Sequence, residues 1–166
     1  RQTNVNLDNK YVVLDISELK GKLLPVGMMI ALDYVWDQVK ADRTKRKMVF
    51  IDEIWKLIGG SANKQAAEFC LEIFKVIRGY GGGALAATQD LSDFFSLEDG
   101  RYGRAILNVS KTKIILNLED DEAERVQDTL HLSDAETMEV THFERGSGLI
   151  STNNNNIMVE FKASPL

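Results

Sequence analysis

Hydrophobic positions along this chain change period several times, and each change predicts a different element. Apolar runs at residues 11–16, 48–51 and 84–88 are typical of strands, and the first two have the composition of strands buried on both faces. Between the runs, residues 25–39 and a stretch that ends near Arg78 carry apolar side chains at helical spacing. The resulting order β-α-β-α-β predicts a parallel sheet with right-handed crossovers.

The two predicted helices differ in how much polar surface they carry. Residues 25–39 leave so little that we expect this helix to be largely covered, with Pro25 in its first turn. The second helix follows the glycines at 59 and 60 and has a clear charged face. Gly79, together with the glycines at 81–83, is expected to end it, since glycine accepts the left-handed conformation of a turn.

The second half of the chain predicts smaller elements and a terminal hairpin. Ser133 followed by Glu136 has the spacing of a helix N-cap, and the acids at 119–122 suit the positive end of another helix. The four asparagines at 153–156 predict a tight turn between two strands. The expected elements are a helical turn at 90–95, a helix at 102–109, and strands at 112–118, 148–152 and 157–162. We find no repeat and no linker, which predicts a single domain over residues 1–166.

Composition narrows the function classes. The hydrophobic content of 44% and charged content of 27% are those of an ordinary soluble protein. The net charge of −5 and the sequence pI near 5.1 argue against a general nucleic-acid-coating surface. The single cysteine, Cys70, lies on a predicted apolar helix face and is expected to be a core thiol. There is no signal peptide and no apolar run of about 18 residues, so membrane association is expected only through partners or other segments.

The candidate chemistry begins where the run at 48–51 ends, because Asp52 and Glu53 follow it directly. The carboxyl ends of parallel strands form the ligand-binding edge of an α/β sheet. A carboxylate there suits a hydrated Mg²⁺ on a nucleotide phosphate, and a second can orient an attacking water. This is the pattern of a Walker B strand, with Asp52 as the Mg²⁺ acid and Glu53 as the catalytic glutamate. The alternative is a core strand that ends in a polar turn.

Thr88 and Gln89 end the next predicted strand and are expected at the same edge. A glutamine beside a catalytic glutamate can hydrogen-bond both a water and a phosphate oxygen, and so report which nucleotide is bound. The alternative for Gln89 is an amide that satisfies loop backbone.

The sequence supports two interpretations of Arg78 about equally. It can act in trans on the nucleotide of a neighbouring subunit, or it can interact with the negative end of its own helix. Two basic groups are expected to be solvated; the second could also serve an interface or a nucleic-acid track. They are Arg43, Lys45, Arg46 and Lys47, and Arg101, Arg104, Lys111 and Lys113. His131 and His142 have no metal-ligand spacing, so no zinc site is predicted.

One motif is missing from the sequence. No G-x-x-x-x-G-K-[ST] loop, which cradles phosphates through backbone N–H groups and a lysine, occurs in these 166 residues. The chain is therefore expected to be the later part of a larger ATPase domain, or no ATPase.

Three strings around these positions resemble the TraC/TrbE/CagE-like ATPases of type IV secretion and conjugative transfer, which are related to hexameric RecA-like DNA translocases. The strings are VFIDEIW at 49–55, IRGYGG at 77–82 and ATQDLSD at 87–93. The resemblance runs from about residue 11 to the end, and its specific parts are the D-E-x-W spacing and the arginine before the T-Q strand. Ile54 stands where many relatives carry alanine.

The resemblance implies the C-terminal part of a RecA-like P-loop NTPase domain, a three-layer α/β fold with a mostly parallel sheet and a C-terminal hairpin. It implies ATP and Mg²⁺ as ligands, with Asp52 and Thr88 binding them and Glu53, Arg78 and Gln89 in catalytic roles. The implied setting is the cytoplasmic face of a secretion channel, with self-association to a hexamer and contacts to other channel components. Alone, the chain is expected to bind nucleotide poorly.

Two alternatives stay open. One is a degenerate, non-hydrolysing RecA-like module used for subunit contacts, which the missing phosphate loop favours. The other is a related DNA translocase, for which the basic residues between 101 and 113 are the local support and which the acidic net charge opposes.

Overall fold

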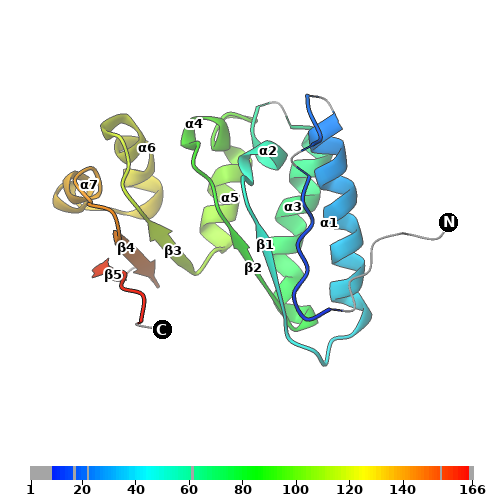
Figure 1. Cartoon of the computed structure of the whole chain (residues 1–166). Coiled ribbons are helices and arrows are strands. Elements are labelled where there is room, and N and C mark those ends of the chain that lie inside the picture. The colour runs from blue at the N-terminus through cyan, green and yellow to red at the C-terminus, as the bar shows by residue number, and fades with distance from the viewer. Residues whose placement is uncertain (1–8, 17, 22, 61, 154, 165–166) are drawn as a thin grey trace. The chain divides into compact units, whose positions relative to one another are not determined.

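The computed structural model describes residues 9–16, 18–21, 23–60, 62–153 and 155–164. The chain forms two compact units, residues 1–102 and 103–166, each described here by itself. The elements of the first unit are α1 (Leu23–Ala41), β1 (Lys47–Ile51), α2 (Trp55–Ile58), α3 (Lys64–Val76), the 3₁₀-helix η1 (Ile77–Tyr80), β2 (Gly82–Ala86) and α4 (Leu91–Phe94) (Figure 1). They are followed by α5 (Arg101–Val109), β3 (Thr112–Ile115), α6 (Asp120–Leu130), α7 (Asp134–Val140), β4 (Ser147–Thr152) and β5 (Asn155–Glu160).

The first unit is built around the parallel pair β1 and β2. Lys47 lies opposite Gly82 and Ile51 opposite Ala86, so the two strands end at the same edge. This confirms the prediction that the runs at 48–51 and 84–88 are parallel neighbours. Helices α1, α2 and α3 contact one another and lie beside the strands (Figure 1). Their shared core includes Ile54, Ile58 and Cys70, which are almost fully buried.

The prediction that the β1 run is buried on both faces is wrong. Ile51 is buried, whereas the side chains of Met48 and Phe50 are 59% and 67% exposed. Successive side chains of a strand point to opposite faces, so one face of the β1–β2 pair is covered and the other is open among the described residues. An apolar run shows that both faces of a strand are suited to burial. It does not show whether the rest of the chain supplies residues that cover both faces.

Two further predictions, a largely covered helix at 25–39 and a strand at 11–16, are also wrong because the residues needed to cover or pair with them are missing among the described residues. Helix α1 is longer than predicted, but it buries one side only, through Met28, Leu32, Trp36 and Val39. Leu23 and Ile30 are about two thirds exposed, so the helix is not largely covered. Residues 11–16 form no strand, and Val13 is 68% exposed. A strand exists through its ladder partners, and residues 11–16 have none among the described residues.

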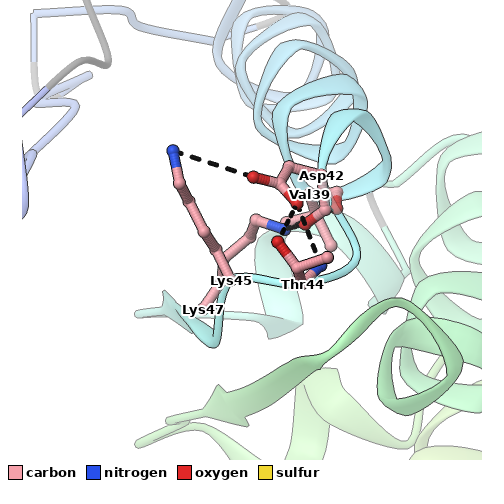
Figure 2. Close-up of polar contacts among 5 residues, drawn as sticks. All are labelled: Val39, Asp42, Thr44, Lys45 and Lys47. Atoms are coloured by element: carbon pink, nitrogen blue, oxygen red, sulfur yellow. Dashed lines mark hydrogen bonds and ion pairs between the residues drawn. The ribbon is translucent and has the colours of Figure 1, made fainter.

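The basic stretch between α1 and β1 is partly structural rather than solvated. The Lys47 ammonium donates to the carbonyl oxygens of Val39, at 3.0 Å, and Asp42, and so satisfies acceptors at the end of α1 (Figure 2). Asp42 in turn accepts from the backbone and hydroxyl of Thr44, and these hydrogen bonds lower the pKa of the Asp42 carboxyl. Lys45 is mostly exposed, and its ammonium forms a long ion pair with the Asp42 carboxylate, at 3.7 Å. Lys47 therefore fastens the start of β1 to the end of α1.

The second unit contains an antiparallel sheet in the order β3-β4-β5. The predicted hairpin is confirmed in β4 and β5, with Thr152 opposite Asn155 and Asn153 at φ 48°; Asn154 lies outside the described residues. Both predicted helix starts carry capping boxes, in which the N-cap side chain and the glutamate three residues on exchange hydrogen bonds. Among the described residues, no helix is both long and apolar enough to cross a membrane.

Candidate functional site

The candidate site forms where β1 and β2 end. The backbone of Ala87 donates to the carbonyl of Ile51 at 2.9 Å and accepts from the N–H of Ile54 at 3.0 Å. Ala87, directly after β2 in the same chain, thus hydrogen-bonds the residues on either side of Asp52 and Glu53. Because the strands are parallel, Thr88 and Gln89 follow Ala87 at the same edge. The register of the pair therefore fixes the backbone on both sides of the predicted site.

Glu53 has an uncommon backbone conformation. Its φ is 52°, in the left-handed region that few residues other than glycine and asparagine adopt. Its N–H donates to Oδ1 of Asp52 at 3.0 Å, which supports the turn from within. Residues held in such conformations are common at functional sites, where the surrounding structure maintains them. Here the two ladder bonds of Ala87 do so.

The Glu53 carboxylate accepts one hydrogen bond at each oxygen. The side-chain amide of Gln89 donates to Oε1, and the indole N–H of Trp55 donates to Oε2. Glu53 and Gln89 are 36 positions apart in the sequence, so the fold brings together two of the predicted site residues. Glu53 is half-buried and Gln89 is exposed, which leaves the carboxylate within reach of a ligand at this edge.

Asp52 and Thr88 flank this pair. The side chain of Asp52 is exposed, and its carboxylate offers the hard oxygen ligands that Mg²⁺ uses when it keeps most of its waters. The described residues contain no group of three or more histidine, cysteine or acidic side chains suited to a metal, so a single carboxylate is what Asp52 offers here. The Thr88 hydroxyl lies 3.3 Å from the carbonyl of Asp90, whose own side chain caps α4. Asp52 therefore fits a water-mediated Mg²⁺ contact.

Arg78 lies at the other end of the strands. It belongs to η1, which precedes β2, whereas Gln89 follows β2. Five strand residues separate these ends, or roughly 16 Å at the usual rise per residue. Arg78 is exposed, and the fold of one chain does not bring it to Glu53. A role for Arg78 in the same subunit's site is therefore not supported by the geometry, and the trans role stays a prediction.

Other candidate residues have structural surroundings. Burial raises the pKa of the Cys70 thiol to about 12, in agreement with the predicted core thiol. Arg101, from the second basic group, forms an ion pair with Glu98 at 3.4 Å, and burial lowers the pKa of Lys113. The Glu98 carboxylate partly offsets the positive charge that Arg101 offers to nucleic acid.

Trp55 is the residue of the site that sequence reasoning left without a role. Its position two residues after Glu53 was part of the specific D-E-x-W spacing. A strand would direct residues 53 and 55 to the same face, but the chain is helical from Trp55 onward. The turn at Glu53 brings the indole N–H back onto the carboxylate, and only the three-dimensional structure shows this contact.

Comparisons with known proteins bear on the family and the fold of the chain. The family model described as the TraG P-loop domain matches residues 1–163. The structure of VirB4 of Thermoanaerobacter pseudethanolicus superimposes with a TM-score of 0.88 at 27% sequence identity. The match covers 97% of this chain and 44% of that one, so this chain spans less than half of that VirB4 chain. No curated protein sequence matches.

More distant structures share the fold alone. The genome packaging NTPase B204 from Sulfolobus turreted icosahedral virus 2, in complex with AMP, matches with a TM-score of 0.59 at 13% identity, over 88% of this chain and 65% of that one. The same NTPase in complex with ATP-gammaS matches with a TM-score of 0.56 at 14% identity, over 79% and 62%. Together with the family match, these structures confirm the predicted P-loop NTPase fold with a parallel sheet and a C-terminal hairpin.

Proposed function

Because the chain belongs to the TraG P-loop domain family and resembles the VirB4 motors of type IV secretion, we propose that it supplies the Walker B half of an ATP-hydrolysing site. The observation that carries the proposal is the contact between Glu53 and Gln89 at the shared edge of β1 and β2. In the proposed whole protein, ATP hydrolysis powers channel assembly or the transfer of DNA or protein.

Each residue has a proposed task at the γ-phosphate. Glu53 orients the attacking water and accepts its proton, while Gln89 hydrogen-bonds that water and a phosphate oxygen. Asp52 holds Mg²⁺ through water, and Thr88 lines the nucleotide site beside Gln89. When bound, the ion neutralises negative charge that develops on the phosphate oxygens. Hydrolysis breaks the bond between the β- and γ-phosphates and releases ADP and inorganic phosphate.

The phosphate-binding loop is proposed to come from polypeptide outside these 166 residues, because no such loop is encoded in them. The proposed assembly is a homo-oligomer in which Arg78 of one subunit approaches the nucleotide of the next. Its proposed location is the cytoplasmic face of the membrane, held there by other channel components.

The test is ATP turnover by the complete polypeptide and by its Glu53→Gln variant. The amide cannot take a proton from water, so turnover is expected to fall by about 10²–10⁴-fold while ATP binding persists. Glu72→Gln, which alters an exposed carboxylate on α3, is the matched control and should turn over like the parent. Parent-like turnover by Glu53→Gln would overturn the proposal.

A further inference from the structure

We propose that Trp55 is a positioning residue that fixes the orientation of the Glu53 carboxylate. The inference rests on the proposed function, in which Glu53 orients water. The observation behind the inference is the hydrogen bond from the Trp55 indole N–H to Oε2 of Glu53. Gln89 donates to the other oxygen of the same carboxylate. The carboxylate is therefore held from two sides, by Gln89 beyond the end of β2 and by Trp55, the first residue of α2.

Trp55 is well placed to hold a partner still. It opens α2, and its carbonyl accepts a hydrogen bond from the N–H of Gly59. Leu57 and Ile58 of the same short helix are 2% and 0% exposed, so the helix is anchored in the core of the first unit. The ring itself is half-buried, with the Lys56 ammonium 5.4 Å from its centre. The indole N–H is thus presented from an anchored backbone.

The orientation of the Glu53 carboxylate needs to be fixed because a free carboxylate rotates easily. The terminal torsion of a glutamate has broad energy wells, so a free carboxylate samples many orientations. Two donors on opposite oxygens select one of them. An ionised carboxylate has about four acceptor sites, so two hydrogen bonds leave capacity for a water. The geometry therefore positions Glu53 without occupying it fully.

The two donors have different expected fates during the reaction. Gln89 is exposed, and its amide is proposed to turn toward the phosphate when nucleotide binds. Trp55 has a single N–H donor, which the Glu53 carboxylate already uses, and its backbone belongs to the anchored helix α2. Trp55 is consequently the contact that persists when Gln89 is drawn away.

The contact itself is tested by NMR on this chain. The chain has two tryptophans, and Trp36→Phe assigns the remaining indole N–H resonance to Trp55. In the Trp36→Phe background, Glu53→Ala is expected to move the Trp55 indole proton upfield and to speed its exchange with water. Glu72→Ala, which removes an exposed helix carboxylate, should change neither. An indole resonance that is indifferent to Glu53→Ala would overturn the inference.

The positioning role is tested by kinetics on the complete polypeptide. Trp55→Phe keeps a ring and removes the N–H, so kcat is expected to fall roughly tenfold, the loss of about one hydrogen bond to a charged group, with KM for ATP unchanged. Trp55→His restores a ring N–H and should recover part of that loss. Trp36→Phe, which changes a ring that packs on Tyr80, should leave kcat unchanged.

The outcomes separate the two proposals. If Glu53→Gln is inactive while Trp55→Phe keeps the parent kcat, the positioning role fails and the proposed function stands. If Glu53→Gln turns over like the parent, the proposed function fails and the positioning role with it. A fall in kcat for Trp55→Phe with partial recovery in Trp55→His supports both.

Discussion

Replacing Lys47 by methionine tests how the first unit is fastened together. Methionine keeps most of the aliphatic stem but loses the ammonium that donates to Val39, at 3.0 Å, and Asp42 (Figure 2). A hydrogen bond to a charged group contributes about 1.5–3 kcal/mol, and a cation at a helix C-terminus about 0.3–1 kcal/mol. The side chain is half-buried, so water recovers part of the loss. We expect the free energy of unfolding to fall by about 2 kcal/mol.

Urea unfolding followed by tryptophan fluorescence measures this change. Both tryptophans lie in the first unit, and Trp36 is on α1 itself, so the signal reports the unit in question. With a urea slope of about 2 kcal/mol per molar, the midpoint should fall by about 1 M.

Lys45→Met is the matched control, because Lys45 is mostly exposed and its ion pair with Asp42 is long. Its midpoint should equal that of the parent. Equal midpoints for Lys47→Met and the parent, or equal losses in both variants, would refute the reasoning.

Two further predictions concern the core of the first unit. A Cβ at Gly59 would lie 2.6 Å from the carbonyl oxygen of Trp55 and 2.7 Å from that of Asp93. Gly59→Ala should therefore lower the free energy of unfolding in urea by about 1–3 kcal/mol. A Cβ at Gly79 would have no atom within 4 Å, so Gly79→Ala is the control and should not change this free energy measurably. The Cys70 thiol has a pKa of about 12 in the folded protein and an ordinary value of 9.0, so the unfolded state releases this proton first as the pH rises. The contribution of Cys70 to stability is therefore full below pH 9 and declines above it, and the free energy of unfolding should fall less steeply with alkaline pH in Cys70→Ala than in the parent. Equal slopes, or rapid reaction of the native thiol with a disulfide reagent near pH 8, would contradict this assignment.

The elements that the sequence predicted best are those whose hydrogen bonds are local. The capping box of Ser133 and Glu136 closes within one helical turn, and Asn153, in the turn after Thr152, adopts a positive φ that asparagine tolerates. The parallel pair of β1 and β2 also followed from sequence, because apolar runs separated by a helix have few alternatives. Because the paired strands end at the same edge, this pairing also places Glu53 close to Gln89.

Only the tertiary structure decided which faces are covered. Phe50 and Ile51 are equally apolar in sequence, yet one is 67% exposed and the other is buried. Residues 11–16 are as apolar as β1 but have no strand partner among the described residues. An apolar side chain is favourable in any covered position, so hydrophobic patterning alone does not identify its neighbours.

The role of Trp55 was hidden for a related reason. Its contact with Glu53 depends on the left-handed backbone of Glu53, which the two hydrogen bonds of Ala87 hold in place from 34 positions along the chain. Sequence determined the local donors and acceptors, namely the two carboxylates, the amide and the indole. Their orientation toward one another depended on a conformation that glutamate does not prefer by itself. Such a conformation persists only when contacts distant in sequence maintain it.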